Sequence, residues 1–358
     1  MPAHLSQPAV TPTTERLAQL MALMSEHGWD QLLFYGHSWR KDFFRYLLNV
    51  NFSGPWAIAS LNRSGEIEVT ISDPWDIDLF PAFKVSLKLQ PVSTPNAAIA
   101  GLELMETRHV EALGIDPVSA TAEVEELRRV KSAEELDCLR RAAALADRGY
   151  HYFAQIIEPG MAEYELVAEV EGFLKCNGAE DNFMLIASGG TEVTGMKPPT
   201  ERRFQPGDQV TTELTPAVNG YYAQICRTLI LGEPNPEQRR AFEIFFEARQ
   251  AAENLLKPGV DVADIARVQN DVFRQYGYGG YTGPKYTRVR GHNLGLHPDE
   301  NPYVLEDVHY RVKEGMVVIA HPNTYLPLSG YMVFGDTLLV TADGCTSLNQ
   351  AGRKLFQK

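Results

Sequence analysis

The feature that most constrains the fold is a repeated pattern in the second half of the chain. The segment EPGMAEYELVAEVEGFL at 158–174 resembles KPGVDVADIARVQNDVF at 257–273, because each has a Pro-Gly turn followed by an amphipathic helix with matching apolar positions. PGDQVTTELTP follows the first copy and EGMVVIAHPNT follows the second. Glu213 and His321 stand six residues after the glycines of these two elements. We therefore expect two related halves that place both residues at matching positions on facing strands, pointing into one cleft.

The remainder of the chain predicts a two-domain organisation. Residues 1–13 are interpreted as a flexible tail. Residues 14–125 alternate a helix with strands such as DQLLFYG, WAIASLN and EIEVTIS, which is typical of an α/β domain. A charged helical segment with a Ser132-x-x-Glu135 capping box then leads into a second domain at 126–358.

Composition excludes several classes of function. A net charge of −13 argues against a nucleic-acid partner or an anionic membrane surface, since both need a basic patch. The chain has no apolar run long enough to span a membrane. Its four cysteines are widely spaced without a C-x-x-C pair, which favours reduced thiols and a cytoplasmic location.

The order of motifs in the second domain resembles the creatinase, aminopeptidase-P and methionine-aminopeptidase superfamily. The motifs are the PGD strand, NGYYAQICRT, the second PG-helix, GHNLGLH, EGMVV and GDTLLVTADG. The helix RRVKSAEELDCLRRAAALAD resembles the domain-linking helix of that superfamily. The resemblance implies an α/β (α+β) protein: a pita-bread domain of two pseudo-symmetric halves, preceded by a creatinase/prolidase-type domain. It also implies a homodimer.

The metallopeptidases of this superfamily hold two metal ions with two aspartates, one histidine and two glutamates. On the matching motifs these positions carry, in order, Glu213, Gln224, His292, His321 and Gly335. Four of the five differ in type from the family pattern, and the two bridging positions are a glutamine and a glycine. Because a dinuclear site needs bridging carboxylates, we expect no dinuclear metallopeptidase.

The metal-free chemistry of creatinase is not matched either. Its catalytic histidine falls on or near Met196, its ERT glutamate becomes Cys226, and Gly54 lies near the place of its carboxylate-binding arginine. Creatine is therefore not the expected substrate.

Two kinds of active site remain open, beside a non-catalytic binding protein. In one, His321 or His292 is a general base oriented by Glu213, without a cofactor, and Cys226 is a weaker candidate nucleophile. In the other, Glu213, His292 and His321 hold a single Fe(II) or Zn(II), because two histidines and one carboxylate suit a mononuclear centre.

Further residues are expected to contact a small-molecule substrate. Asp336 is expected among the polar residues of the cleft. One of the two arginines before GHNLG is expected to point inward and the other away. The expected substrate-binding residues are His297, Gln224, Cys226, Arg288, Arg290, Tyr222, Trp39 and Arg40.

The sequence thus predicts a hydrolase that cleaves a C–N bond of a small polar, non-peptide metabolite. A mononuclear iron oxidase or oxygenase is the first alternative, and a non-catalytic binding homologue is the second.

Overall fold

The computed structural model describes residues 12–358, so the predicted tail lies outside the described residues except for its last two positions. The chain divides into two compact units, Met1–Arg128 and Arg129–Lys358. No helix in the described part of the chain is long and apolar enough to cross a membrane.

The first unit is built around a mixed sheet whose described strands run in the order β4-β3-β2-β1-β5-β6. Its central strand β1 pairs antiparallel with β2 and parallel with β5. The elements are α1 (Thr14–His27), β1 (Gln31–His37), α2 (Asp42–Leu47), β2 (Trp56–Asn62), β3 (Ile67–Ile71), η1 (Pro74–Leu79), β4 (Lys84–Ser86), β5 (Ala97–Ala100), η2 (Leu102–Leu104), α3 (Thr107–Ala112), β6 (Val118–Ser119) and α4 (Thr121–Arg129).

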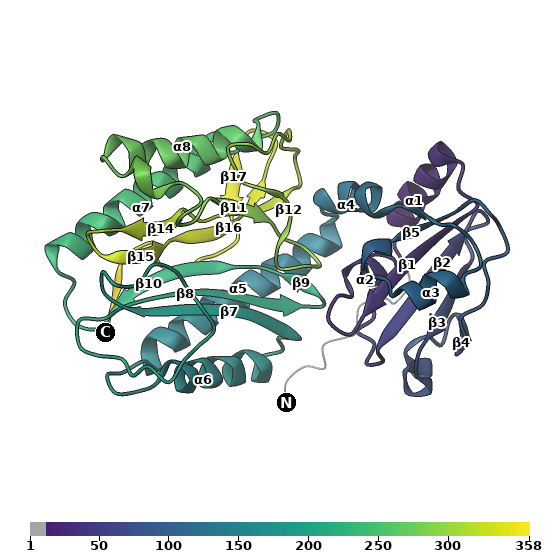
Figure 1. Ribbon diagram of the computed structural model, residues 1–358, viewed down its shortest axis with the longest axis horizontal. Coiled ribbons are helices and arrows are strands. Elements are labelled where there is room, and N and C mark those ends of the chain that lie inside the picture. Colours follow the sequence, from purple (N-terminus) through teal and green to yellow (C-terminus); the bar gives the residue numbers. More distant parts are fainter. Residues whose placement is uncertain (1–11) are drawn as a thin grey trace. The chain divides into compact units, whose positions relative to one another are not determined.

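The second unit carries a larger sheet whose main path is β12-β11-β13-β16-β10-β8-β7, and a separate hairpin formed by β14 and β15 (Figure 1). Its helices are α5 (Ala133–Ile156), α6 (Glu163–Cys176), α7 (Pro236–Leu255), α8 (Val262–Gln275) and η3 (Gly279–Tyr281). Its strands are β7 (Asp181–Gly189), β8 (Gln209–Val218), β9 (Tyr221–Tyr222), β10 (Ile225–Ile230), β11 (Gly291–Asn293), β12 (Glu300–Tyr303), β13 (Val317–Ala320), β14 (Asn323–Leu326), β15 (Gly330–Val333), β16 (Gly335–Val340), β17 (Cys345–Ser347) and β18 (Phe356–Gln357).

The two predicted halves are visible in the backbone. The turns before α6 and α8 have glycines with φ of +91° at Gly160 and +85° at Gly259, a region that glycine enters without steric cost. The turns before β8 and β13 match in the same way, with +90° at Gly207 and +82° at Gly315. Isolated bridges join 162 to 203 in one half and 261 to 311 in the other, at equal offsets from these glycines. The repeat in the sequence therefore reflects a repeat in structure.

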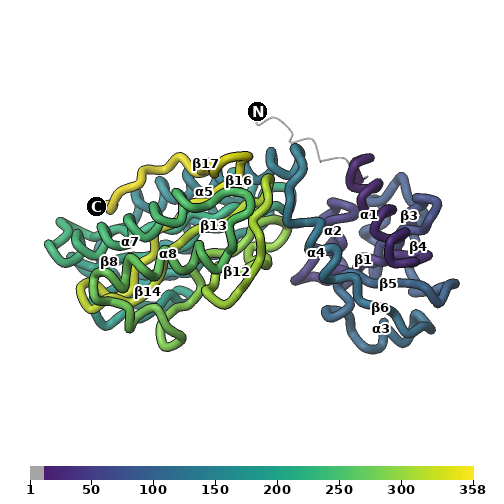
Figure 2. The backbone as a smooth tube through the Cα atoms, turned by 90° about the horizontal axis from the view of Figure 1, so that it is seen from above, coloured from purple at the N-terminus to yellow at the C-terminus, as the bar shows by residue number. Residues whose placement is uncertain are grey.

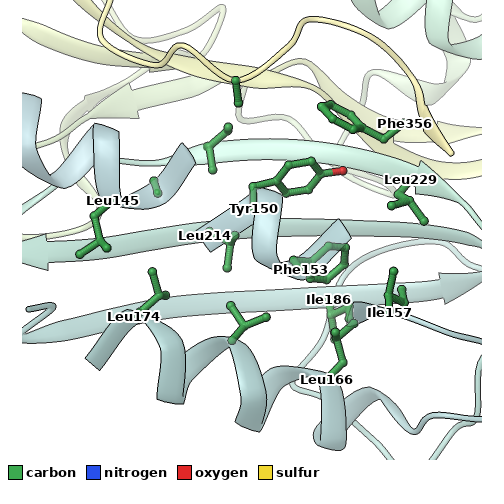
Figure 3. Close-up of a cluster of buried hydrophobic side chains, with 14 of the residues drawn as sticks. Leu145, Tyr150, Phe153, Ile157, Leu166, Leu174, Ile186, Leu214, Leu229 and Phe356 are labelled. Atoms are coloured by element: carbon green, nitrogen blue, oxygen red, sulfur yellow. The ribbon is translucent and has the colours of Figure 1, made fainter. Parts of the chain in front are cut away.

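Strand register shows that both helix pairs cover the same face of the sheet. Leu214 pairs with Ile225, and Ile225 pairs with Asp336, so their side chains share a face. Leu214 and Ile225 belong to a buried apolar cluster that includes residues of α5 and α6; Leu214 is labelled in this cluster in Figure 3. Further along that face, apolar residues of β13 and β16 pack beneath α7 and α8, which run side by side in Figure 2. The opposite face is therefore left for polar residues.

Candidate active site

A row of residues crosses the face of the sheet that the helices leave uncovered. Glu213 on β8 pairs with Cys226 on β10, and Cys226 pairs with Gly335 on β16. A Cβ atom added to Gly335 would lie 2.5 Å from the Cβ atom of His321, so His321 stands directly beside this glycine. The two residues related by the sequence repeat thus lie on one face, and only a cysteine and a glycine separate them along the row.

A parallel row lies two residues further along the strands. Thr215 and Thr337 lie two residues after Glu213 and Gly335, and Gln224 lies two residues before Cys226, because β10 runs antiparallel to β8 and β16. His292 enters the same face from β11, where it pairs with Ile319. The structure therefore brings Glu213, Gln224, Cys226, His292 and His321 to one polar face.

Glu213 is a buried carboxyl group with a perturbed acidity. Its residue is 7% exposed, and no positively charged side chain is paired with it in the described part of the chain. Burial, and then the negative charge of Asp299, raises the pKa of Glu213 to about 7. A carboxyl group in this state exchanges protons near neutral pH, which general acid–base catalysis requires.

His292 and His321 form a pair of buried rings with centroids 5.2 Å apart in an edge-to-face arrangement. Nδ1 of His292 lies 2.9 Å from the carbonyl oxygen of Asn293, which favours the tautomer protonated at Nδ1 and leaves Nε2 as an acceptor. His321 is 4% exposed, and neither of its ring nitrogens has a hydrogen-bond partner in the described part of the protein. Burial, and then His292, lowers the pKa of His321 well below its ordinary value, so its ring is neutral.

Asp299 is a site residue that the sequence did not single out. Its carboxylate oxygen lies 3.5 Å from Nδ1 of His292, and its charge acts on Glu213. Nδ1 of His297 lies 3.0 Å from the carbonyl oxygen and 3.2 Å from the amide nitrogen of Asp299, and a substrate contact of His297 stays a prediction. The turn at 297–299 therefore presents the aspartate beside His292, and sequence spacing alone gives no signal for this.

Gln224 and Cys226 contact each other within the polar face. Nε2 of Gln224 donates to Sγ of Cys226 at 3.2 Å. Burial, and then Glu213, raises the pKa of the Cys226 thiol well above its ordinary value. A thiol that resists ionisation is a poor nucleophile, so the burial of Cys226 disfavours it as an attacking group.

The two arginines before GHNLG differ in environment. Arg290 is fully buried and donates to Oδ1 of Asn270 at 2.6 Å and to the carbonyl oxygen of Asn323 at 2.9 Å. Arg288 is exposed and pairs with Asp307. A strand would place both on one side, because side chains two residues apart share a face, but residues 287–290 are not a strand.

Tyr222 pairs with Ala217 of β8 and so lies on the same face as Glu213, where its hydroxyl donates to Asp181 at 2.8 Å at the start of β7. The other two expected substrate contacts lie in the first unit. Trp39, which is 91% exposed, and Arg40, which pairs with Asp42 at 3.0 Å, lie in the first unit on the turn between β1 and α2. The role of these residues in substrate binding stays a prediction.

Asp336 corrects an expectation, because it does not belong to the polar face. It pairs with Ile225 on the face that the helices cover, and its carboxylate lies 2.6 Å from Arg227 and 2.8 Å from Arg249 of α7. Neighbouring residues of a strand point to opposite sides, so a row that includes Gly335 excludes Asp336.

The β14–β15 hairpin borders the row. The carbonyl oxygen of Tyr331 accepts hydrogen bonds from Nε2 of Gln209 at 2.7 Å and from Oγ1 of Thr211 at 3.4 Å. The Tyr331 side chain is buried, and after burial the charge of Glu213 contributes to raising its pKa. Tyr331 was not predicted from the sequence, because only the hairpin register brings it near Glu213.

Residues 12–358 contain no group of three or more His, Cys, Asp and Glu side chains gathered closely enough to hold a metal ion. The mononuclear arrangement of Glu213, His292 and His321 is therefore not assembled as a three-ligand cluster in the structure.

The fold and this polar face define a protein of the pita-bread class with a creatinase/prolidase-type first domain. Residues 137–342 match the model of Metallopeptidase family M24, and the chain belongs to that family, a family of hydrolases. Over 235 residues it is 32% identical to the Xaa-Pro dipeptidase of Pyrococcus furiosus and 31% identical to that of Pyrococcus horikoshii. Each match covers 65% of this chain and 66% of the relative, just under two thirds of its length.

Solved structures resemble nearly the whole chain. The prolidase of Pyrococcus horikoshii OT3 superimposes with a TM-score of 0.83 at 23% identity, covering 95% of this chain and 99% of the other. Aminopeptidase P of E. coli has a TM-score of 0.78 at 17% identity, with 96% and 97% covered. These structures confirm the predicted fold class, and the family match confirms the predicted superfamily.

The function predicted from the sequence is wrong in its substrate. The relatives are named as Xaa-Pro dipeptidases, prolidases and dipeptidases, which points to peptide hydrolysis and not to a non-peptide metabolite or an oxidase. Changed polar side chains alter how a bond is activated, but they carry no information about the molecule that presents the bond. The prediction used the changed side chains as evidence for a changed substrate, which they do not provide.

Proposed function

We propose that this protein hydrolyses the peptide bond of short peptides, with Xaa-Pro dipeptides as the leading substrates. The support is membership of Metallopeptidase family M24 and identity above 30% to two proteins named Xaa-Pro dipeptidase. The observation that carries the proposal is the row on the polar face, where the buried carboxyl of Glu213 and the unpartnered ring of His321 flank Cys226 and Gly335.

The family name implies metal ions, and we infer that these residues do not fit a carboxylate-bridged pair of them. The mapped positions offer one carboxylate, one neutral amide, two imidazoles and a glycine. A side chain at position 335 would also need a Cβ atom only 2.5 Å from that of His321, so a bridging carboxylate cannot stand there beside the histidine. The proposed steps therefore involve only protein groups and water. The single Fe(II) or Zn(II) expected as an alternative is tested by metal analysis.

Glu213 is proposed as the general base. A pKa of about 7 leaves a substantial fraction of the carboxylate form at neutral pH, yet makes that form more basic than an ordinary glutamate. The carboxylate takes a proton from a water molecule, and the water oxygen forms a bond with the carbonyl carbon of the peptide. The protonated Glu213 then gives the proton to the departing amine nitrogen as the C–N bond breaks.

His321 is proposed to stabilise the reacting carbonyl group. A neutral imidazole has one N–H donor, and this ring has no protein partner for either nitrogen in the described structure. The donor can therefore bind the carbonyl oxygen as negative charge develops on it. His292, whose Nδ1 lies 2.9 Å from the carbonyl oxygen of Asn293, packs edge-to-face with this ring.

The test is hydrolysis of a panel of dipeptides and tripeptides, with and without proline at the second position, followed by chromatography of the released amino acids. We expect cleavage of Xaa-Pro dipeptides and a loss of about 10²–10⁴-fold in kcat for Glu213→Gln. Glu314→Gln, at an exposed glutamate, is the matched control and should leave kcat unchanged. Binding of dipeptides without cleavage, or full activity of Glu213→Gln, would contradict the proposal.

A further inference from the structure

Three tyrosines from two segments pack into one aromatic surface, here called the tyrosine wall: Tyr281, Tyr286 and Tyr325. The rings of Tyr286 and Tyr325 stack at 13° with centroids 5.6 Å apart. Tyr281 lies 5.0 Å from Tyr286 and 5.7 Å from Tyr325, tilted by 52° and 44°. The rings touch one another, so the wall has no gap that could enclose a cation, and it offers ring surface on its open side.

The wall is anchored to the β14–β15 hairpin. Oγ1 of Thr324, next to Tyr325 on β14, donates to the carbonyl oxygen of Tyr281. All three tyrosine residues are only partly buried, and Tyr281 also packs against a buried apolar cluster of α7, α8 and the hairpin. A plain structural core would bury these rings, because aromatic side chains contribute most when they are removed from water.

The wall continues from the polar face. Tyr325 pairs with Tyr331 across the hairpin, and paired residues of antiparallel strands carry their side chains on the same side. Tyr331 is the residue whose backbone is bound by Gln209 and Thr211, close to Glu213 on β8. On the other side of the wall, Thr287 follows Tyr286 and hydrogen-bonds the Tyr331 side chain. Tyr325 is therefore connected to Tyr331 by strand pairing, and Tyr286 is connected to it through its neighbour Thr287. Tyr331 in turn lies near Glu213, the proposed base.

We propose that the tyrosine wall is a specificity subsite for an aromatic side chain at the Xaa position of an Xaa-Pro dipeptide. Offset or edge-to-face packing of a substrate ring on partly exposed tyrosines gains energy beyond the area it buries, and a small aliphatic side chain cannot gain it. The three rings are neutral, and Nζ of Lys285 lies 5.5 Å from the centre of the Tyr286 ring, so a neutral aromatic side chain is favoured there over a cationic one. This inference rests on the proposed peptidase function.

The test compares kcat/KM and calorimetric affinity for Phe-Pro and Ala-Pro. In the natural protein we expect Phe-Pro to be preferred by about tenfold, the effect of one aromatic contact. Tyr286→Ala and Tyr325→Leu should each reduce the ratio of Phe-Pro to Ala-Pro in kcat/KM and in affinity severalfold. The matched control is Tyr276→Ala, because Tyr276 lies just before the same loop but packs against Arg240 and binds Glu247, outside the wall.

The outcomes separate the two proposals. If no dipeptide is cleaved, the peptidase function fails, and a tighter affinity for Phe-Pro that Tyr286→Ala abolishes would still support the subsite. If dipeptides are cleaved without preference for Phe-Pro, or if the preference survives Tyr286→Ala and Tyr325→Leu, the subsite is overturned. Equal loss of preference in Tyr276→Ala would also overturn it, because the effect would then come from general loosening of the loop.

Discussion

The buried carboxyl group of Glu213 links the chemistry of the site to the stability of the fold. Its pKa is about 7 in the folded protein against an ordinary value of 4.5. The native state therefore holds more protons than the unfolded state between these two pH values. By linkage, the free energy of unfolding falls as pH rises from about 4.5 to about 7, by roughly 3 kcal/mol for this group, and stays lowered above that range.

Glu213→Gln should remove this pH-dependent loss, because a glutamine has no proton to release. We expect the variant to unfold at higher urea concentration than the natural protein at pH 8, with a smaller difference at pH 5. Urea titrations at the two pH values measure this, and Glu314→Gln serves as the exposed control. A variant less stable than the natural protein at pH 8 would show that the ionised carboxylate has a stabilising partner.

Asp299 should set the acidity of Glu213 in the working enzyme. Its negative charge raises the pKa of Glu213, so Asp299→Asn should move the rising limb of the rate-against-pH profile to lower pH. Asp307→Asn, at an exposed aspartate that pairs with Arg288, is the matched control and should leave the profile in place. An unmoved profile in Asp299→Asn would mean that its carboxylate is too well solvated to affect Glu213.

Residue roles were less predictable from the sequence than residue positions. Glu213 and His321 are predictable by counting from two glycines, because a repeated turn fixes the distance to each residue of the next strand. The position of Asp299 beside His292 was not predicted, because it depends on the turn at 297–299. This turn directs His297 toward backbone groups and Asp299 toward His292. Such side-chain directions depend on tertiary contacts that one sequence does not display.

At the scale of elements, the close approach of β16 to the end of β13 explains Gly335. A Cβ atom at this position would meet the Cβ atom of His321 at 2.5 Å and the carbonyl oxygen of Ala320 at 2.7 Å. These are backbone or near-backbone atoms, which cannot move aside without shifting a strand. The histidine at 321 and the glycine at 335 are therefore sterically linked.

Gly335→Ala should destabilise the protein by about 1–3 kcal/mol, the usual effect of forcing an extra carbon into a packed site. The free energy of unfolding from urea titration measures it. Gly172→Ala in α6 is the control, because nothing lies within 4 Å of its added carbon and alanine favours a helix. Equal stability of Gly335→Ala and the natural protein would show that the strands separate easily here.

Element identities were predicted well where a local signal exists. The capping box at the start of α5 is present, with Oε2 of Glu135 2.7 Å from the backbone nitrogen of Ser132. The position of Asp336 was misjudged although strand alternation contains the information: if Gly335 faces the site, its neighbour faces away. The hairpin contacts of Tyr331 had no local signal, since they depend on the packing of β15 against β8.

At the scale of the whole molecule, the order of motifs was enough to predict the fold, and the changed side chains were not enough to predict the substrate. Fold follows from many weak signals that agree along the chain, whereas chemistry depends on a few side chains. The names of the relatives point to peptides as the substrate class, and the reaction by protein groups without bridged metal ions is our proposal from the side chains on the polar face.

The most direct test of peptide hydrolysis by protein groups alone is the rate of Xaa-Pro cleavage after metal has been removed with a chelator. Metal content is measured by mass spectrometry on the same sample. We predict that kcat/KM is retained with far less than one metal ion per chain, and that it falls in Glu213→Gln. Loss of activity on chelation, restored in proportion to about two bound ions per chain, would contradict this mechanism.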